Sequence, residues 1–270
     1  MTPCPSCGAD RGHLLGCENN TISIAPAAVA PVAEVPDAEL DTTRPRALGV
    51  PIALAIAGLI GMTGLGQMAL RLFFGMWLHE LGHATASWIC GVFAVPLPWI
   101  TLGGQSRSPA MIILFFGILG FTAWKKLAPL WLLAIPAAAL LLGILIPFKH
   151  ATTFITFFGD GGALVYGTVL MLAGLLLPDE SRLSRGGLRW GYLVIGAGAF
   201  MDAFLTWFRS WRDFAELPFG RSESSGLSDA LKLVDVAGWS ETGMIRAYLG
   251  LSLLCLAVLA GATVRQLTKR

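Results

Sequence analysis

Two histidines and a glutamate lie within one five-residue window of an otherwise apolar stretch. His79, Glu80 and His83 form the pattern His-Glu-x-x-His. Residues four apart on a helix lie about 40° apart around the axis and one turn along it, so both imidazoles can face one metal ion. Glu80 is adjacent to a ligand, a position that favours contact with water over ligation of the metal. The spacing therefore predicts a zinc ion held by His79 and His83.

These residue types meet the requirements of peptide hydrolysis by a zinc enzyme. Zinc lowers the pKa of water to about 7 and polarises a carbonyl group. Glu80 would take a proton from water and pass it to the leaving amine, as general base and then general acid. A buried polar cluster and a proton or ion path in a transporter are alternatives, but neither requires this order of residues.

The segments that must carry the motif are strongly apolar. Of the 270 residues, 55% are hydrophobic and 13% are charged, whereas soluble domains have about 25% charged residues. A soluble core cannot absorb so many apolar side chains, so we expect an integral membrane protein in contact with the lipid bilayer. A net charge of +2 is too small to favour nucleic acid as a partner.

Apolar runs of spanning length follow one another along most of the chain. They cover approximately residues 48–65, 67–90, 110–124, 127–147, 151–177, 188–208 and 245–263. We therefore predict an all-α bundle of about seven transmembrane helices in the membrane domain 47–270, with the motif on the second helix. The polar segment 209–244 is expected to be its sizeable loop outside the membrane.

The first 46 residues have a different composition from the rest. Four candidate metal ligands lie close together there: Cys4, Cys7, His13 and Cys17. A Cys-x-x-Cys pair with Pro and Gly is typical of zinc knuckles, so we predict structural zinc in residues 1–20, with a flexible tail or a redox pair as alternatives. Residues 21–46 are rich in Pro and Ala and are expected to be a flexible linker. Zinc thiolates favour a reducing compartment, which places the N-terminus in the cytoplasm.

The motif region resembles the site-2 protease family of intramembrane zinc metalloproteases. Residues 77–84, Trp-Leu-His-Glu-Leu-Gly-His-Ala, are similar to the first motif of that family, and residues 159–162, Gly-Asp-Gly-Gly, are similar to the segment that carries its third zinc ligand. The resemblance covers roughly residues 67–178. It implies catalytic zinc on His79, His83 and Asp160, with Glu80 as the catalytic residue.

The resemblance also implies a function and a location. We expect a zinc endopeptidase that cuts membrane-embedded or membrane-proximal protein substrates, with residues 92–104 matching the short β-structured segment of the family. No PDZ-like insertion is present, so a minimal, multi-pass member of the bacterial inner membrane is the nearest type. The chain has no Asn after Asn20 and therefore lacks the Asn that often precedes the ligand Asp in the family.

Several assignments stay open at this point. Asp160 is favoured as third ligand because its glycine neighbours allow close helix approach, and Asp202 competes with it or accepts a hydrogen bond from a ligating histidine. Arg71 is expected to reach the membrane interface, with contact to a carboxylate as the alternative. For the whole chain, the alternative function is a transporter or channel that uses intramembrane His, Glu and Asp for protons or metal ions.

The N-terminal module yields the first testable prediction. A synthetic peptide of residues 1–20 should bind Co²⁺ without the membrane domain, because its four candidate ligands are local in sequence. Cobalt–thiolate absorption measures this, and a peptide with Cys4 and Cys7 replaced by Ser is the matched control. A parent peptide without cobalt–thiolate absorption would contradict the zinc knuckle.

Overall fold

The structure is a computed structural model of the chain and describes residues 43–125, 130–177, 187–222 and 226–268. The predicted zinc knuckle, residues 1–20, lies outside these ranges. Helix α1 begins at Thr43, inside the range expected for the linker, and its Pro45 lies in the first turn. Proline is tolerated in that turn because its missing N–H would have no partner within the helix.

Helices make up most of the described residues, as predicted. The long helices are α1 (Thr43–Gly61), α6 (Phe148–Leu176), α7 (Leu188–Arg212) and α9 (Glu241–Thr268). The motif segment is helical throughout, as α2 (Gly64–Leu70), η1 (Arg71–Gly75) and α3 (Met76–Ile89). Two shorter apolar helices are α4 (Pro109–Trp124) and α5 (Leu130–Leu145). The polar segment contains η3 (Phe214–Glu216), β3 (Arg221–Ser222), β4 (Gly226–Leu227), α8 (Asp229–Leu231) and η4 (Lys232–Val236).

Three of the described helices, α6, α7 and α9, are long and apolar enough to cross a membrane. The other predicted spans coincide with shorter apolar helices, which include residues 47–61, 109–124 and 136–145, or with the motif segment. A span needs about 20 residues of α-helix, and α4 and α5 have 16 each. The structure thus supports three candidate spans, and the count of seven stays a prediction.

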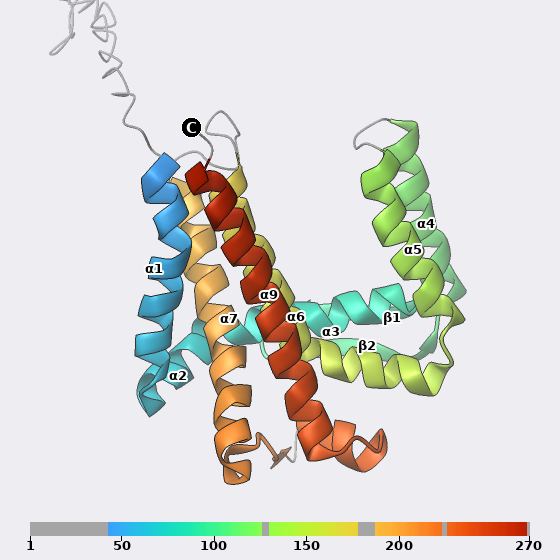
Figure 1. Cartoon of the computed structure of the whole chain (residues 1–270). Helices are drawn as coiled ribbons and strands as arrows, with labels where there is room; N and C mark the ends of the chain where they lie inside the picture. The colour runs from blue at the N-terminus through green and yellow to red at the C-terminus, as the bar shows by residue number, and fades with distance from the viewer. Residues whose placement is uncertain (1–42, 126–129, 178–186, 223–225, 269–270) are drawn as a thin grey trace, which may run out of the picture. The chain divides into compact units, whose positions relative to one another are not determined.

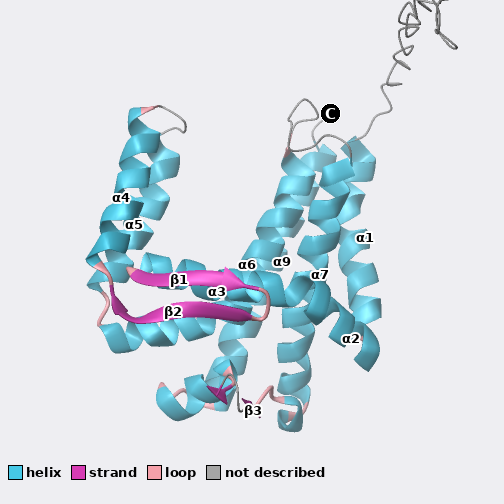
Figure 2. Cartoon of the chain, turned by 180° about the vertical axis from the view of Figure 1, so that it is seen from behind, coloured by secondary structure: helices cyan, strands magenta, loops and turns pink. Residues whose placement is uncertain are grey.

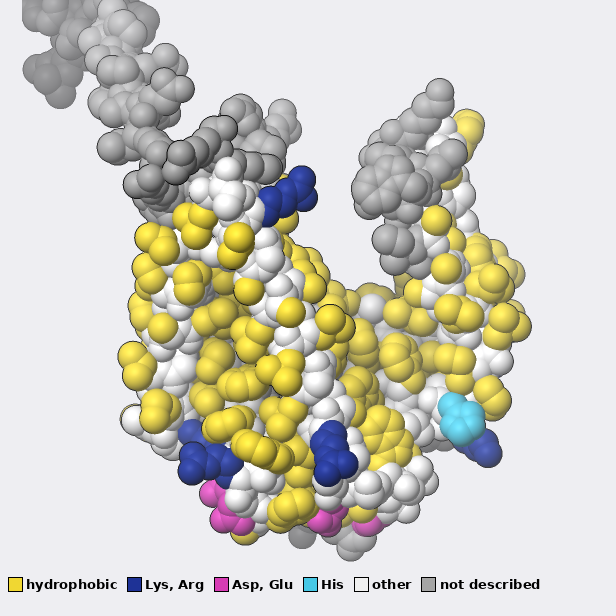
Figure 3. Space-filling model, viewed as in Figure 1, with side chains coloured by type: hydrophobic (Ala, Val, Ile, Leu, Met, Phe, Trp, Pro, Cys, Tyr) yellow, Lys and Arg dark blue, Asp and Glu magenta, His cyan; other side chains and the backbone are white. Residues whose placement is uncertain are grey.

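The surface of the helical bundle fits this membrane character. Hydrophobic side chains cover much of the flank seen in Figure 3, whereas acidic side chains and several basic ones gather at the lower end. Large apolar side chains are exposed on α1 and α9, among them Leu59, Leu253 and Leu254. A continuous exposed apolar surface of this kind is typical of a face that meets lipid or another protein.

Helix α6 connects the motif helix to the rest of the bundle. Its first part packs against α3 and its later part against α7, and Figure 1 shows α6 changing direction between them. At the crossing with α3, a Cβ on Gly82 would collide with the Phe158 carbonyl and the Gly162 Cα. Gly167 and Gly196 form a similar contact between α6 and α7. The glycines bring these backbones into direct contact.

An antiparallel hairpin lies beside the motif helix (Figure 2). It consists of β1 (Val92–Leu97) and β2 (Ile100–Arg107), so the segment 92–104 is β-structured as the resemblance implied. Its turn contains Trp99 at a φ of 67°. The hairpin contacts α3, so it stays next to the motif.

The helix crossing yields a prediction about stability. Gly82→Ala should lower the free energy of unfolding by about 1–3 kcal/mol, because the added methyl has no room beside the backbone of α6. Thermal unfolding of the purified chain in detergent measures the effect. Gly250→Ala on α9 is the matched control, since a Cβ there meets nothing within 4 Å. Equal melting temperatures for the two variants would contradict the crossing.

Candidate metal centre

Each motif histidine is held by an acceptor on α6. The Nδ1 atom of His83 lies 2.8 Å from the carbonyl oxygen of Ile155, and the Nδ1 atom of His79 lies 2.7 Å from Oδ1 of Asp160. A carbonyl and an ionised carboxylate only accept hydrogen bonds, so both Nδ1 atoms carry the proton and donate it. In a neutral ring, Nε2 is then left with a lone pair.

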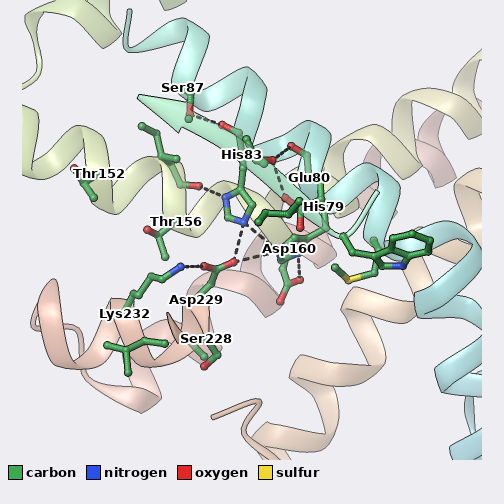
Figure 4. A pocket seen from close by; sticks show the side chains of 18 of the residues that line it. His79, Glu80, His83, Ser87, Thr152, Thr156, Asp160, Ser228, Asp229 and Lys232 are labelled. Atoms are coloured by element: carbon green, nitrogen blue, oxygen red, sulfur yellow. Dashed lines mark hydrogen bonds and ion pairs between the residues drawn. The ribbon is translucent and has the colours of Figure 1, made fainter. Parts of the chain in front are cut away.

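The two Nε2 atoms face each other across a short gap. They are 3.1 Å apart, and Oδ2 of Asp229 lies 3.1 Å from the Nε2 atom of His79 and 2.8 Å from that of His83 (Figure 4). Among the described residues, these three side chains form a group whose ligand atoms all lie within 4.8 Å of one another. Two imidazole nitrogens and a carboxylate oxygen are suitable donors for a divalent metal ion.

Asp160 lies close to this group, but on the outer side of the His79 ring. Its Oδ1 accepts from Nδ1 of His79 and its Oδ2 accepts a 3.0 Å hydrogen bond from Nε1 of Trp207. The glycines around Asp160 bring α6 against α3, as the sequence analysis expected. The structure thus groups Asp160 with Nδ1 of His79 and groups Asp229 with the Nε2 pair.

Asp229 is not among the candidates predicted from the sequence, in which it is one of several charged residues of the polar segment 209–244. Asp229 is the first residue of α8, where Ser228 caps the helix by accepting from the Leu231 N–H. Asp229 is partly buried, and its Oδ2 points at Nε2 of both motif histidines. The Ser-Asp pair indicates a helix start, and nothing in the local sequence indicates contact with the distant motif.

Glu80 is buried and is held by the hairpin. The hydroxyl of Thr101, on β2, donates to Oε2 of Glu80 at 2.7 Å, and a second contact from this hydroxyl to the Glu80 carbonyl oxygen measures 2.9 Å. Thr101 is a second site residue that is not among the candidates predicted from the sequence. Its position shows that the hairpin fixes the carboxylate beside the two histidines.

These side chains share one cavity of about 750 Å³. Its walls come from α3, from β2, from the first part of α6 and from the segment 227–232, and His79, Glu80, His83, Asp160 and Asp229 all line it. The volume falls within the range of about 300–1,000 Å³ that is usual for ligand sites. The polar segment thus forms one wall of the cavity, and the motif helix forms another.

Asp202 belongs to a different polar cluster. Gln67 donates to its Oδ1 at 2.8 Å, and the Arg71 guanidinium lies 3.7 Å from its Oδ2. Arg71 therefore contacts a carboxylate, which is the alternative that the sequence left open for this residue. The cluster ties α2 and η1 to α7, next to the motif helix.

Comparisons with known proteins add no relative. No protein-family model, no curated protein and no solved structure matches the chain. The function is therefore argued from the side chains of the site and from their geometry.

The site makes Gly159 a sensitive position. A Cβ on this residue would lie 2.6 Å from Nε2 of His83 and 2.7 Å from Cε1 of His79, so Gly159→Ala should displace both rings and lower zinc retention. Zinc per chain after dialysis measures this. Gly161→Ala is the matched control, because its Cβ would meet Phe157 and Leu251 instead. If both variants keep as much zinc as the parent, the rings do not hold the ion.

Proposed function

We propose that the chain is a membrane zinc metalloprotease that hydrolyses peptide bonds of membrane-embedded or membrane-proximal proteins. One observation carries the proposal: the Nε2 atoms of His79 and His83 converge at 3.1 Å in a cavity that Glu80 also lines. His-Glu-x-x-His on a helix is the residue order typical of zinc metalloproteases. The resemblance of the motif to that of the site-2 proteases points in the same direction.

The donor set fits a zinc ion. Both imidazoles have an outer hydrogen-bond acceptor, the Ile155 carbonyl and the Asp160 carboxylate, which orients the rings as metal-ligating histidines require. When bound, zinc would supply Lewis-acid polarisation of the scissile carbonyl and easier ionisation of water. Asp160, which the resemblance implies as third ligand, and Asp229 are the two carboxylates next to the histidines.

In the proposed reaction, Glu80 transfers a proton from water to the leaving nitrogen. Thr101 donates to Oε2 and so fixes the carboxylate, and Oε1 is the oxygen that accepts a proton from water. As the water oxygen bonds to the carbonyl carbon and the C–N bond breaks, Glu80 returns this proton to the leaving nitrogen. The buried position of Glu80 keeps its carboxylate oriented toward the reaction instead of toward bulk water.

The hairpin supports a peptide as substrate. Ile100, Thr101, Gly103 and Gly104 of β2 line the cavity, and β2 pairs with β1 in a two-stranded sheet. A strand in such a sheet offers one further edge, where an extended peptide can add through main-chain hydrogen bonds. A transporter or channel for protons or metal ions, the alternative function, needs neither this edge nor Glu80 beside the metal ligands.

Glu80→Gln should separate metal binding from catalysis. Zinc content should stay at the parent level, because the residue is not a ligand, and cleavage should fall by about 10²–10⁴-fold, since the amide cannot accept the proton. Cleavage of a library of synthetic transmembrane peptides in liposomes, followed by mass spectrometry, provides the measurement. Glu216→Gln, at an exposed position of η3, is the matched control. Undiminished cleavage by Glu80→Gln would exclude the proposed mechanism.

A further inference from the structure

We infer that Asp229, from the polar segment, is the third ligand of the metal site and that Asp160 is the residue that positions His79. The inference rests on the proposed metalloprotease function, because it assigns ligands at the same site. It departs from the ligand set that the resemblance implies. Four observations on His79, His83, Asp160 and Asp229 carry it.

The first observation is that three atoms able to accept hydrogen bonds face one another: Nε2 of His79, Nε2 of His83 and Oδ2 of Asp229. With their Nδ1 protons donated to Asp160 and to the Ile155 carbonyl, the rings of His79 and His83 present lone pairs on Nε2 when they are neutral. Oδ2 of Asp229 is also an acceptor and lies within 3.1 Å of both nitrogens. Acceptors at this separation repel one another unless a proton or a metal cation lies between them, and one divalent ion can bind all three.

The second observation is the size of the triangle. Its sides are 3.1 Å between the two nitrogens, 3.1 Å from Asp229 to His79, and 2.8 Å from Asp229 to His83. Donors in a tetrahedral zinc site with bonds of about 2.0–2.1 Å are about 3.3 Å apart. The three atoms therefore have nearly the spacing of one face of a zinc tetrahedron, and the fourth corner remains for water or substrate.

The third observation is that both oxygens of Asp160 accept hydrogen bonds from groups other than the Nε2 pair. Its two oxygens accept from Nδ1 of His79 and from Nε1 of Trp207. Nδ1 and Nε2 point away from different edges of the imidazole ring, so a short Asp side chain on one of them cannot bind a metal ion on the other. A carboxylate on the outer nitrogen of a ligating histidine is a common arrangement that orients the ring.

The fourth observation is that Lys232 holds the Asp229 carboxylate on the side away from the histidines. Lys232 donates to Oδ1 at 3.0 Å, which leaves Oδ2 directed at the histidines. The next residues anchor the segment, since Ala230 and Leu233 are buried in the main hydrophobic core. The contact of Asp229 with the motif is therefore part of the packed structure and not a contact of an isolated surface side chain.

Zinc affinity tests the assignment. We would purify the full chain with Cys4, Cys7 and Cys17 replaced by Ser, so that the N-terminal candidates add no metal, and measure the zinc dissociation constant by competition with a chelator. Asp229→Asn should weaken binding by more than about 100-fold, whereas Asp160→Asn should weaken it by about 10–100-fold, the usual cost of losing an orienting carboxylate.

A second readout reports direct contact with the metal. In the same background, Asp229→Cys loaded with Co²⁺ should show thiolate-to-cobalt charge-transfer absorption, because a thiolate at a ligand position binds the metal. Asp160→Cys should lack this band. Asp235→Asn and Asp235→Cys, at an exposed position of η4, are the matched controls and should behave like the parent.

The outcomes separate the ligand assignment from the function. If Asp229→Asn binds zinc like the parent and the charge-transfer band appears with Asp160→Cys, the assignment is overturned and Asp160 is the ligand. If His83→Ala also binds zinc like the parent, the metal site itself fails, and the proposed function fails with it. Loss of zinc in His83→Ala and Asp229→Asn, with the band at position 229, supports the inference.

Discussion

The candidate site depends on the direct contact between the backbones of α3 and α6. Gly82 meets the backbone of α6 at Phe158 and Gly162, and Gly159 leaves room for both histidine rings. Because no side chain separates the helices, the Ile155 carbonyl and the Asp160 carboxylate come within hydrogen-bond distance of the two Nδ1 atoms. Larger residues at the crossing would move α6 outward, and the rings would lose the acceptors that set their orientation.

Around this crossing, three separate parts of the chain contribute one function each. The motif helix provides the two nitrogens and Glu80, the hairpin fixes Glu80 through Thr101, and the polar segment brings Asp229 to the nitrogens. The long helices α7 and α9 support these parts from behind: Trp207 of α7 donates to Asp160, and Tyr248 of α9 stacks on Trp207 with ring centroids 4.0 Å apart. Asp160 thus connects His79 of the candidate site to Trp207 of the supporting helix α7.

The sequence alone predicted the features that depend on local spacing. Two histidines one turn apart must share a helix face, and Asp160 among glycines must lie where helices touch, so these residues were found together. Asp229 was missed because its contact with His83 joins residues 146 positions apart, and no periodicity encodes such a pairing. The contact of Arg71 with Asp202 stayed one of two alternatives, since Asp202 lies on another helix. Seven apolar runs were recognised, but apolar character alone does not distinguish a span from a shorter helix, and three of the described helices are both long and apolar enough to cross a membrane.

Within the part of the chain that the structure describes, no strand pairs with the outer edge of β2, which affects how tightly the proposed protease would hold a peptide. Several side chains of the hairpin are large, apolar and exposed, among them Phe93, Trp99 and Leu102. Where such a hairpin meets lipid instead of water, the free N–H and C=O groups along its edge have no solvent to bond with, and each such group costs several kcal/mol. An extended peptide that pairs with this edge removes that cost, so the same hydrogen bonds contribute more to affinity there than they would in water. In the proposed protease, low hydration at this edge would therefore favour a substrate segment that unwinds as it pairs with β2.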